Sequence, residues 1–141
     1  MILLDTNIVS EVMKTRPAES VVAWLNGQDS ENLYICAITI GEITYSLRIL
    51  ADGKRRSALR ERFERFVALA FDQRVLAYDE SAARVYGELM GERKEMGLPL
   101  GFPDGQIAAI ARLNHLAVAT RNVCDFENCG IDVVNPFTSV L

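Results

Sequence analysis

Short apolar runs alternate along this chain with longer amphipathic segments, and this alternation limits the fold more than any other feature. The run Ile2–Leu4 is continuously apolar, as in a strand that is buried on both faces. Further short strands are expected at residues 33–36, 74–78, 116–120 and 133–134. Strands that alternate with helices predict an α/β fold in which helices cover both faces of a mostly parallel sheet.

The segments between these runs carry the signals of helices. Their apolar residues recur at helical spacing, and charged residues occupy the opposite side. Asp79 is placed to cap one of these helices, and Pro103 suits the first position of another. Helices are therefore expected over residues 8–25 with a break at Pro17, 39–50, 55–71, 80 to about 96, and 103–113.

Length and composition predict one globular domain over residues 1–141, because 50% of the residues are hydrophobic and 24% are charged. Fifteen basic against nineteen acidic residues give a net charge of −4, which excludes a protein that coats nucleic acid through its overall charge. Three cysteines in a chain that needs no disulfide indicate reduced thiols and a cytoplasmic location. No signal peptide is expected, and no run approaches the ~20 apolar residues of a membrane span.

Four acidic residues are placed where chemistry is expected in such a fold. Asp5 directly follows the first strand, Asp104 lies in the first turn of its helix, and Asp125 follows the fourth strand. Glu42 borders the apolar stripe of its helix, and the neighbouring Gly41 suggests a close approach of another backbone. Ligand sites in parallel α/β folds lie beyond the carboxyl ends of the strands, so these acids are expected near one edge of the sheet.

Carboxylates that lie close together raise one another's pKa and repel, and a divalent cation removes this conflict. Mg²⁺ and Mn²⁺ prefer oxygen ligands, can activate water, and neutralise the charge that develops on a phosphodiester. Such a cation explains how an acidic protein acts on a polyanion. Each acid also has an ordinary explanation: Asp5 as a helix cap, Asp104 as a favourable charge at a helix start, Glu42 as solvated surface and Asp125 as a turn residue.

Four segments resemble, in order and spacing, the signature blocks of one family. They are residues 3–7, 37–42, 103–109 and 119–126, and the family is that of the PIN-domain ribonucleases. The resemblance extends over nearly the whole chain and is greatest to the VapC toxins of type II toxin–antitoxin systems, in particular their FitB-like branch. It implies a three-layer α/β/α fold with a parallel sheet of four or five strands.

The resemblance also implies an activity and partners. It implies a Mg²⁺-dependent endoribonuclease, with Mn²⁺ as a substitute, that leaves a 5′-phosphate and a 3′-hydroxyl. The expected substrate is tRNA or another structured RNA. Such proteins are usually homodimers inhibited by a small antitoxin encoded beside them, and DNA binding in the complex belongs to the antitoxin.

Carried over by position, the resemblance makes Asp5 and Asp104 the principal metal ligands and Glu42 a ligand or a supporting acid. Many relatives carry a fourth acid where this chain has Asn122, whereas others have an acid three residues later. This chain is of the second kind, with Asp125. Whether Asn122 or Asp125 supplies the fourth ligand, and whether one metal or two are bound, stays open.

The remaining candidate residues support this site. Thr6 and Asn7 follow the first acid as in the family, and Thr120 is expected to hold a ligand or a water through its hydroxyl. Arg121 follows the fourth strand and is a candidate phosphate contact. The basic stretch at residues 54–65 is either a solvated helix face or a contact for RNA or a partner.

Two other function classes would also use an acidic residue after the first strand. A binding module with little turnover, associated with RNA or DNA and acting mainly with its antitoxin, has the same acidic pocket and differs only in lacking cleavage. A phosphatase of the haloacid-dehalogenase type needs an acid two residues after its nucleophilic aspartate. Asn7 stands at that place after Asp5, which argues against the phosphatase.

Overall fold

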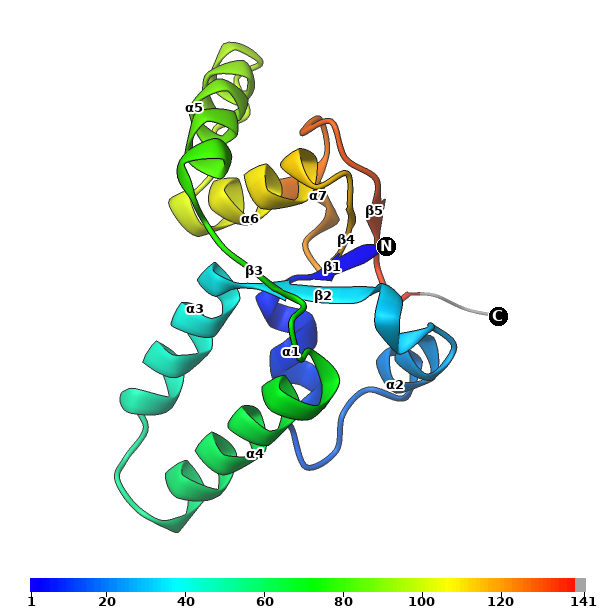
Figure 1. The fold of residues 1–141 in the computed structure, drawn as a ribbon, viewed down its shortest axis with the longest axis vertical. Helices are drawn as coiled ribbons and strands as arrows, with labels where there is room; N and C mark the ends of the chain where they lie inside the picture. The colour runs from blue at the N-terminus through cyan, green and yellow to red at the C-terminus, as the bar shows by residue number, and fades with distance from the viewer. Residues whose placement is uncertain (139–141) are drawn as a thin grey trace.

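A five-stranded sheet divides the computed structural model into layers, and residues 1–138 are described (Figure 1). The strands lie in the order β3-β2-β1-β4-β5, and every neighbouring pair is parallel. They are β1 (Ile2–Leu4), β2 (Leu33–Cys36), β3 (Val75–Leu76), β4 (Ala117–Ala119) and β5 (Val133–Val134). The predicted parallel sheet is therefore confirmed.

Helices cover both faces of the sheet, which confirms the three-layer α/β/α architecture (Figure 1). One face carries α1 (Thr6–Val12), α2 (Glu19–Asn26), α3 (Ala37–Arg48) and α4 (Lys54–Ala70). The other face carries α5 (Glu80–Glu95), α6 (Phe102–Leu113) and the short α7 (Val123–Phe126). Within residues 1–138, none of the helices has both the length and the apolar character needed to cross a bilayer.

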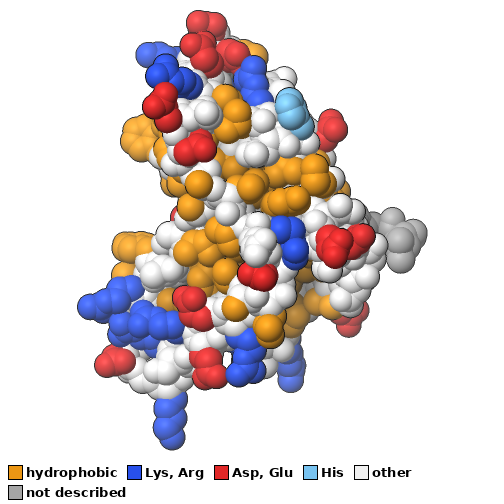
Figure 2. All heavy atoms as spheres, in the orientation of Figure 1, with side chains coloured by type: hydrophobic (Ala, Val, Ile, Leu, Met, Phe, Trp, Pro, Cys, Tyr) orange, Lys and Arg blue, Asp and Glu red, His pale blue; other side chains and the backbone are white. Residues whose placement is uncertain are grey.

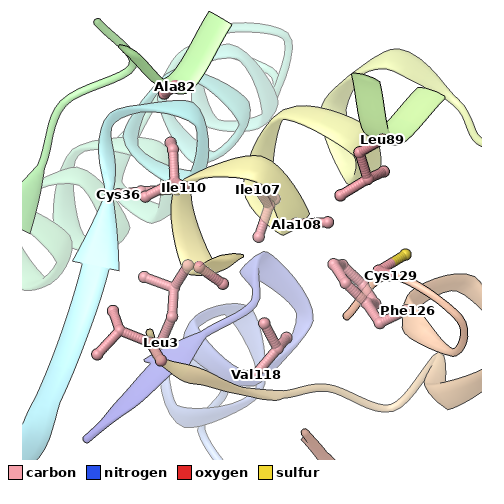
Figure 3. Packing of buried hydrophobic residues seen from close by; sticks show 12 residues of the cluster. Leu3, Cys36, Ala82, Leu89, Ile107, Ala108, Ile110, Val118, Phe126 and Cys129 are labelled. Carbon is pink, nitrogen blue, oxygen red and sulfur yellow. The ribbon is translucent and has the colours of Figure 1, made fainter. Parts of the chain in front are cut away.

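The two faces of the sheet have separate cores, because successive strand residues point to opposite sides. Leu3 packs into the core under α5 and α6, whereas Leu4 packs into the core with α1 to α4. Figure 3 shows Ile107 and Ala108 of α6 close to Leu3 and Val118 of the strands. All five side chains are fully buried, and burial of a side chain of leucine size contributes roughly 1.5–3 kcal/mol.

Most of the predicted helix signals are found in the structure. The Asp79 carboxylate accepts a hydrogen bond from the Ala82 N–H at 3.0 Å, and Pro103 lies in the first turn of α6. No sequence pattern predicts α7, because four residues are too short to show a helical period. The same applies to the 3₁₀ turn η1 (Ser30–Asn32), which precedes β2.

The prediction of a close approach at Gly41 is wrong. A Cβ atom built there meets nothing within 4 Å. The close contact lies instead at Gly105 in the first turn of α6, where a Cβ atom would be 2.5 Å from the Met90 sulfur and 3.0 Å from the Tyr86 ring. Gly105 therefore lets α6 pack closely on α5, next to Asp104.

We expect Gly105→Ala to lower the free energy of unfolding by up to about 1 kcal/mol. The flexible Met90 side chain can move aside, and the helix preference of alanine offsets part of the cost of displacing it and the Tyr86 ring. The matched control is Gly91→Ala on α5, where a Cβ atom has open space and alanine should stabilise the helix by about 0.5–1 kcal/mol. Urea denaturation of both variants gives the two values. Equal stabilisation by both substitutions would contradict the packing at Gly105.

Candidate active site

The candidate site lies where the order of the strands reverses direction. The chain leaves β1 toward β2 on one side, and β4 later pairs with β1 on the other side. Asp5 follows β1 and Thr120 follows β4, and the Asp5 N–H donates to the Ala119 carbonyl at 2.9 Å. The first predicted acid therefore stands at the switch point of the sheet, where ligands bind in folds of this kind.

Both carboxylate oxygens of the buried Asp5 have partners. Oδ1 accepts from the Thr6 N–H at 2.7 Å, so Asp5 caps α1. Oδ2 accepts from the Thr120 hydroxyl at 2.7 Å and from the Asn7 amide at 3.2 Å. The capping explanation is correct, but it accounts for only one of the two oxygens.

Glu42 reaches the same site from α3. The Thr6 hydroxyl donates to Glu42 Oε1 at 2.7 Å and lies 3.0 Å from the hydroxyl of the buried Thr39. Thr6 is the residue next to Asp5, so it ties the helix that carries Glu42 to the end of β1. Glu42 is therefore held in place and is not part of a freely solvated helix surface.

A pocket of about 330 Å³ brings three of the four predicted acids together. Its lining includes seven of the predicted residues: Asp5, Glu42, Asp104, Thr6, Asn7, Arg121 and Asn122. Thr120 is fully buried behind Asp5 and does not line the pocket. Asp125 lies on α7 outside the lining, yet close enough for its charge to act on Asp104.

The acids of the site are electrostatically coupled. The pKa of Asp5 is raised to about 6, chiefly by burial. The hydrogen bonds from Thr120 and Thr6 lower it in part, and the charges of Asp104 and Glu42 contribute to the rise. Burial also raises the pKa of Asp104, and the charges of Asp125 and Glu42 add to that effect. A cation among these carboxylates would relieve the repulsion and the cost of burial together.

Within residues 1–138, no three His, Cys, Asp or Glu side chains already stand as a ready set of ion ligands. Mg²⁺ needs no such set, because it keeps several waters and takes only one or two carboxylates directly. Asp5 and Asp104, which line one pocket and repel each other, supply the oxygen chemistry that this ion prefers. The donor residues therefore fit a hydrated divalent cation.

The segment after β4 is folded back onto the segment after β1. The Arg121 N–H donates to Asn7 Oδ1 at 3.2 Å, and the Asn122 N–H donates to the Thr120 hydroxyl oxygen at 3.0 Å. Because Asn7 and Thr120 also contact Asp5, these bonds hold the carboxylate from two directions. In the structure, the hydrogen bond of the Thr120 hydroxyl goes to the Asp5 carboxylate.

Sequence reasoning missed three residues of the pocket, namely Ser10, Glu11 and Lys14 of the α1 region. Glu11 is buried, although it is charged. It stands three residues after Ile8, on the apolar side of α1. A carboxylate at an apolar position of a short helix is the signal that could have identified it, because a buried charge requires partners.

Comparisons with known proteins agree with the fold. A match to the PIN domain extends over residues 2–126. The chain is 42% identical over 137 residues to VapC ribonuclease Y4jK of Sinorhizobium fredii, covering 97% of this chain and 98% of that protein. It is 34% identical to the tRNA(fMet)-specific endonuclease VapC of Shigella flexneri, with 91% of each chain covered.

Solved structures give the same assignment. The crystal structure of FitAcB from Neisseria gonorrhoeae contains a chain that is 38% identical, with a TM-score of 0.93 over 99% of this chain and 100% of that one. A structure of FitAB bound to a DNA fragment matches with a TM-score of 0.93 and 37% identity over 100% of this chain and 99% of that one. With a family match over most of its length and relatives that span nearly all of it, this chain is a PIN-domain protein of the VapC type.

Proposed function

We propose that this chain, as one PIN domain over residues 1–141, is a divalent-cation-dependent endoribonuclease and the toxin of a type II toxin–antitoxin pair. The observation that carries the proposal is the pocket at the switch point, where Asp5, Glu42 and Asp104 meet. The charge of Glu42 raises the pKa of both aspartates there. Relatives over nearly the whole length are named ribonuclease and tRNA(fMet)-specific endonuclease, which supports RNA as the substrate.

Asp5 and Asp104 would hold the cation, which is Mg²⁺ with Mn²⁺ as a substitute. When bound, such an ion polarises water and neutralises charge on the phosphodiester. Thr120 and the Thr6 N–H keep the Asp5 carboxylate in one orientation, and the Thr6 hydroxyl does the same for Glu42. Glu42 is then the group placed to orient the attacking water and to accept its proton.

The fourth acid of the proposed site is Asp125, with Asn122 as a supporting residue. Asn122 lines the pocket through a neutral side chain, whereas Asp125 acts on Asp104 through its charge from α7. We propose that Asp125 contributes through water and through this charge. Asn122 contributes through its N–H bond to Thr120, which positions the residue behind Asp5.

The test is cleavage of a panel of tRNAs and structured RNAs by the purified protein with Mg²⁺, with Mn²⁺ or with EDTA. Discrete cuts that require the cation and leave 5′-phosphate ends are expected. Cuts that persist in EDTA would overturn the dependence on a cation. Retained RNA without any cut would instead favour a binding module that acts in a complex.

The proposed partner is a small antitoxin that brings DNA binding to the complex. The solved FitAB structure, which includes DNA, supports such an assembly. A groove of about 350 Å³ between α1, α3 and α4 adjoins the acid pocket, since Ser10 and Lys14 line both. Its floor includes Ile43, Leu47 and Leu59, which suits apolar side chains of a partner helix. We propose further that the toxin is a homodimer in the cytoplasm.

The basic stretch of α4 borders this groove. Figure 2 shows Lys and Arg side chains gathered over the half of the molecule that α3 and α4 form. Arg55 and Arg62 line the groove, and Arg62 donates to the Met13 carbonyl at 2.8 Å. Arg65 instead pairs with Glu61 at 3.2 Å on an exposed face. Some residues of the basic stretch therefore line the groove, and others lie on the solvated face of α4.

We expect Leu59→Asp to abolish capture of the antitoxin, because the new carboxylate would be buried in the apolar part of the groove. The matched control is Leu69→Asp on the same helix, where the side chain is 79% exposed and lies outside the groove. Co-purification with the product of the adjacent reading frame measures the effect. Equal capture by both variants would remove this groove from the proposed interface.

A further inference from the structure

Glu11 is a buried carboxylate with three donors around it. Its side chain is 6% exposed, Oε2 accepts from the Ala18 N–H at 2.9 Å, and Oε1 accepts from Lys14 Nζ at 2.9 Å. The Arg121 guanidinium lies 3.5 Å from the same oxygen. One cation would balance this charge, so Glu11 with Lys14 and Arg121 forms a group of net charge +1.

Arg121 is fixed by a second contact. Its guanidinium carbon lies 3.8 Å from the centroid of the Phe137 ring, a cation–π arrangement. The Arg121 side chain is still 52% exposed, and that of Lys14 is 58% exposed. Lysine has three donors and arginine five, so each keeps N–H groups free of Glu11 and available to a ligand. The two cations are therefore oriented and accessible at the same time.

Both cations line the acid pocket, on the side of α1 and the segment after β4. The pocket thus combines the carboxylates of Asp5, Glu42 and Asp104 with a basic edge. We use this term for Lys14 and Arg121, which both contact Glu11. The net charge of −4 repels RNA overall, so basic side chains placed at the site itself contribute most to RNA affinity. Guanidinium and ammonium groups side by side suit the two free oxygens of a phosphodiester.

We infer that Lys14 and Arg121, which the buried Glu11 holds in position, bind a backbone phosphate of the RNA next to the phosphodiester that is cut. The inference rests on the proposed function and adds to it a positioning device for the substrate. Glu11 orients the two cations and does not contact the RNA. The acidic side of the pocket then serves the cation and the reaction, and the basic edge sets the position of the strand.

The test is RNA binding as a function of salt, in an Asp104→Asn background so that the strand is not cut. The probe is a fluorescently labelled single-stranded RNA, and its anisotropy gives the Kd. Each phosphate contact contributes about 0.7 to the slope of log K against log salt concentration. Lys14→Met and Arg121→Met should each reduce the slope by about 0.7, and the double variant by about 1.4.

The matched control is Arg84→Met on α5, because Arg84 is 77% exposed, pairs with Glu80 and lies outside the pocket. Its slope should equal that of the parent. Glu11→Gln, which keeps an acceptor for the Ala18 N–H, should weaken binding several-fold although it adds positive charge. Tighter binding by Glu11→Gln would overturn the orienting role of Glu11.

The outcomes separate this inference from the proposed function. Cation-dependent cleavage by the wild-type protein, together with an unchanged slope in the double variant, would overturn only the inference. A wild-type protein that cleaves no RNA would overturn both. An unchanged RNA slope with lost antitoxin capture would also overturn the inference, because the two cations would then bind carboxylates of the protein partner.

Discussion

Asp104→Asn is expected to reduce cation-dependent RNA cleavage by about 100-fold or more, since even residues that only support metal ligands contribute 10–100-fold. Asparagine keeps the size of the side chain and removes one of the two carboxylate charges that we propose to hold the cation. The fold should survive, because a negative charge at a helix start contributes only about 0.3–1 kcal/mol. Single-turnover cleavage of the identified RNA, at saturating Mg²⁺, measures the effect.

The matched control for this variant is Asp72→Asn. It removes the same charge from an exposed turn outside the pocket and should leave the cleavage rate unchanged. Both proteins must be purified identically, so that a contaminating nuclease would show as equal rates. A folded Asp104→Asn protein that cleaves at the wild-type rate would remove Asp104 from the site.

Asp5→Asn is expected to have two opposite effects, a loss of cleavage and a gain in stability without the cation. The pKa of Asp5 rises from 3.8 to about 6 mainly through burial, which corresponds to a destabilisation of roughly 3 kcal/mol at neutral pH. Asparagine removes this cost, but its single carbonyl oxygen can accept only one of the bonds from Thr6 and Thr120. We therefore expect the free energy of unfolding in EDTA to increase by about 1–3 kcal/mol.

The increase in the free energy of unfolding caused by Asp5→Asn should grow as pH rises. The folded Asp5 binds a proton more tightly than the unfolded chain does, so the wild type loses stability as pH rises from about 4 to about 6. The difference between Asp5→Asn and wild type should be full at pH ~7 and should vanish below pH ~4. Urea denaturation in EDTA at several pH values measures it.

Saturating Mg²⁺ gives an independent readout for Asp5. The ion binds only the folded state, so it should raise the Tm of the wild type and should have little effect on Asp5→Asn. Asp72→Asn should respond to Mg²⁺ as the wild type does. If Asp5→Asn were less stable than the wild type at pH ~7 in EDTA, the buried carboxylate would not carry the electrostatic cost assigned to it.

Much of the fold could be predicted from local patterns in the sequence. Continuous apolar runs identified the strands, and capping by Asp79 and the position of Pro103 identified two helix starts. Helix α3 begins and ends two residues earlier than the predicted range 39–50. Its start is earlier because the chain passes from β2 through Ala37 and Ile38 directly into the helix. Such a boundary depends on tertiary packing rather than on local propensity.

The acids of the site were identified by their positions after strands, but their individual roles depend on contacts between distant segments. The bond between Thr6 and Glu42 joins residues 36 positions apart, and that between Thr120 and Asp5 joins residues 115 apart. No local pattern reports such pairs. The position of Glu11 on the apolar side of α1 is a local signal, but its role depends on Arg121 from the other half of the chain, which no local pattern reports.

The pairing of β1 with β4 also determines when the pocket can exist during synthesis. Asp5 leaves the ribosome well before Ala117–Ala119, the strand that completes its surroundings. Long-range pairs of this kind form late and slowly. A nascent toxin therefore has no assembled pocket until β4 and Thr120 have emerged, so synthesis of the later segment sets the earliest time at which the site can form.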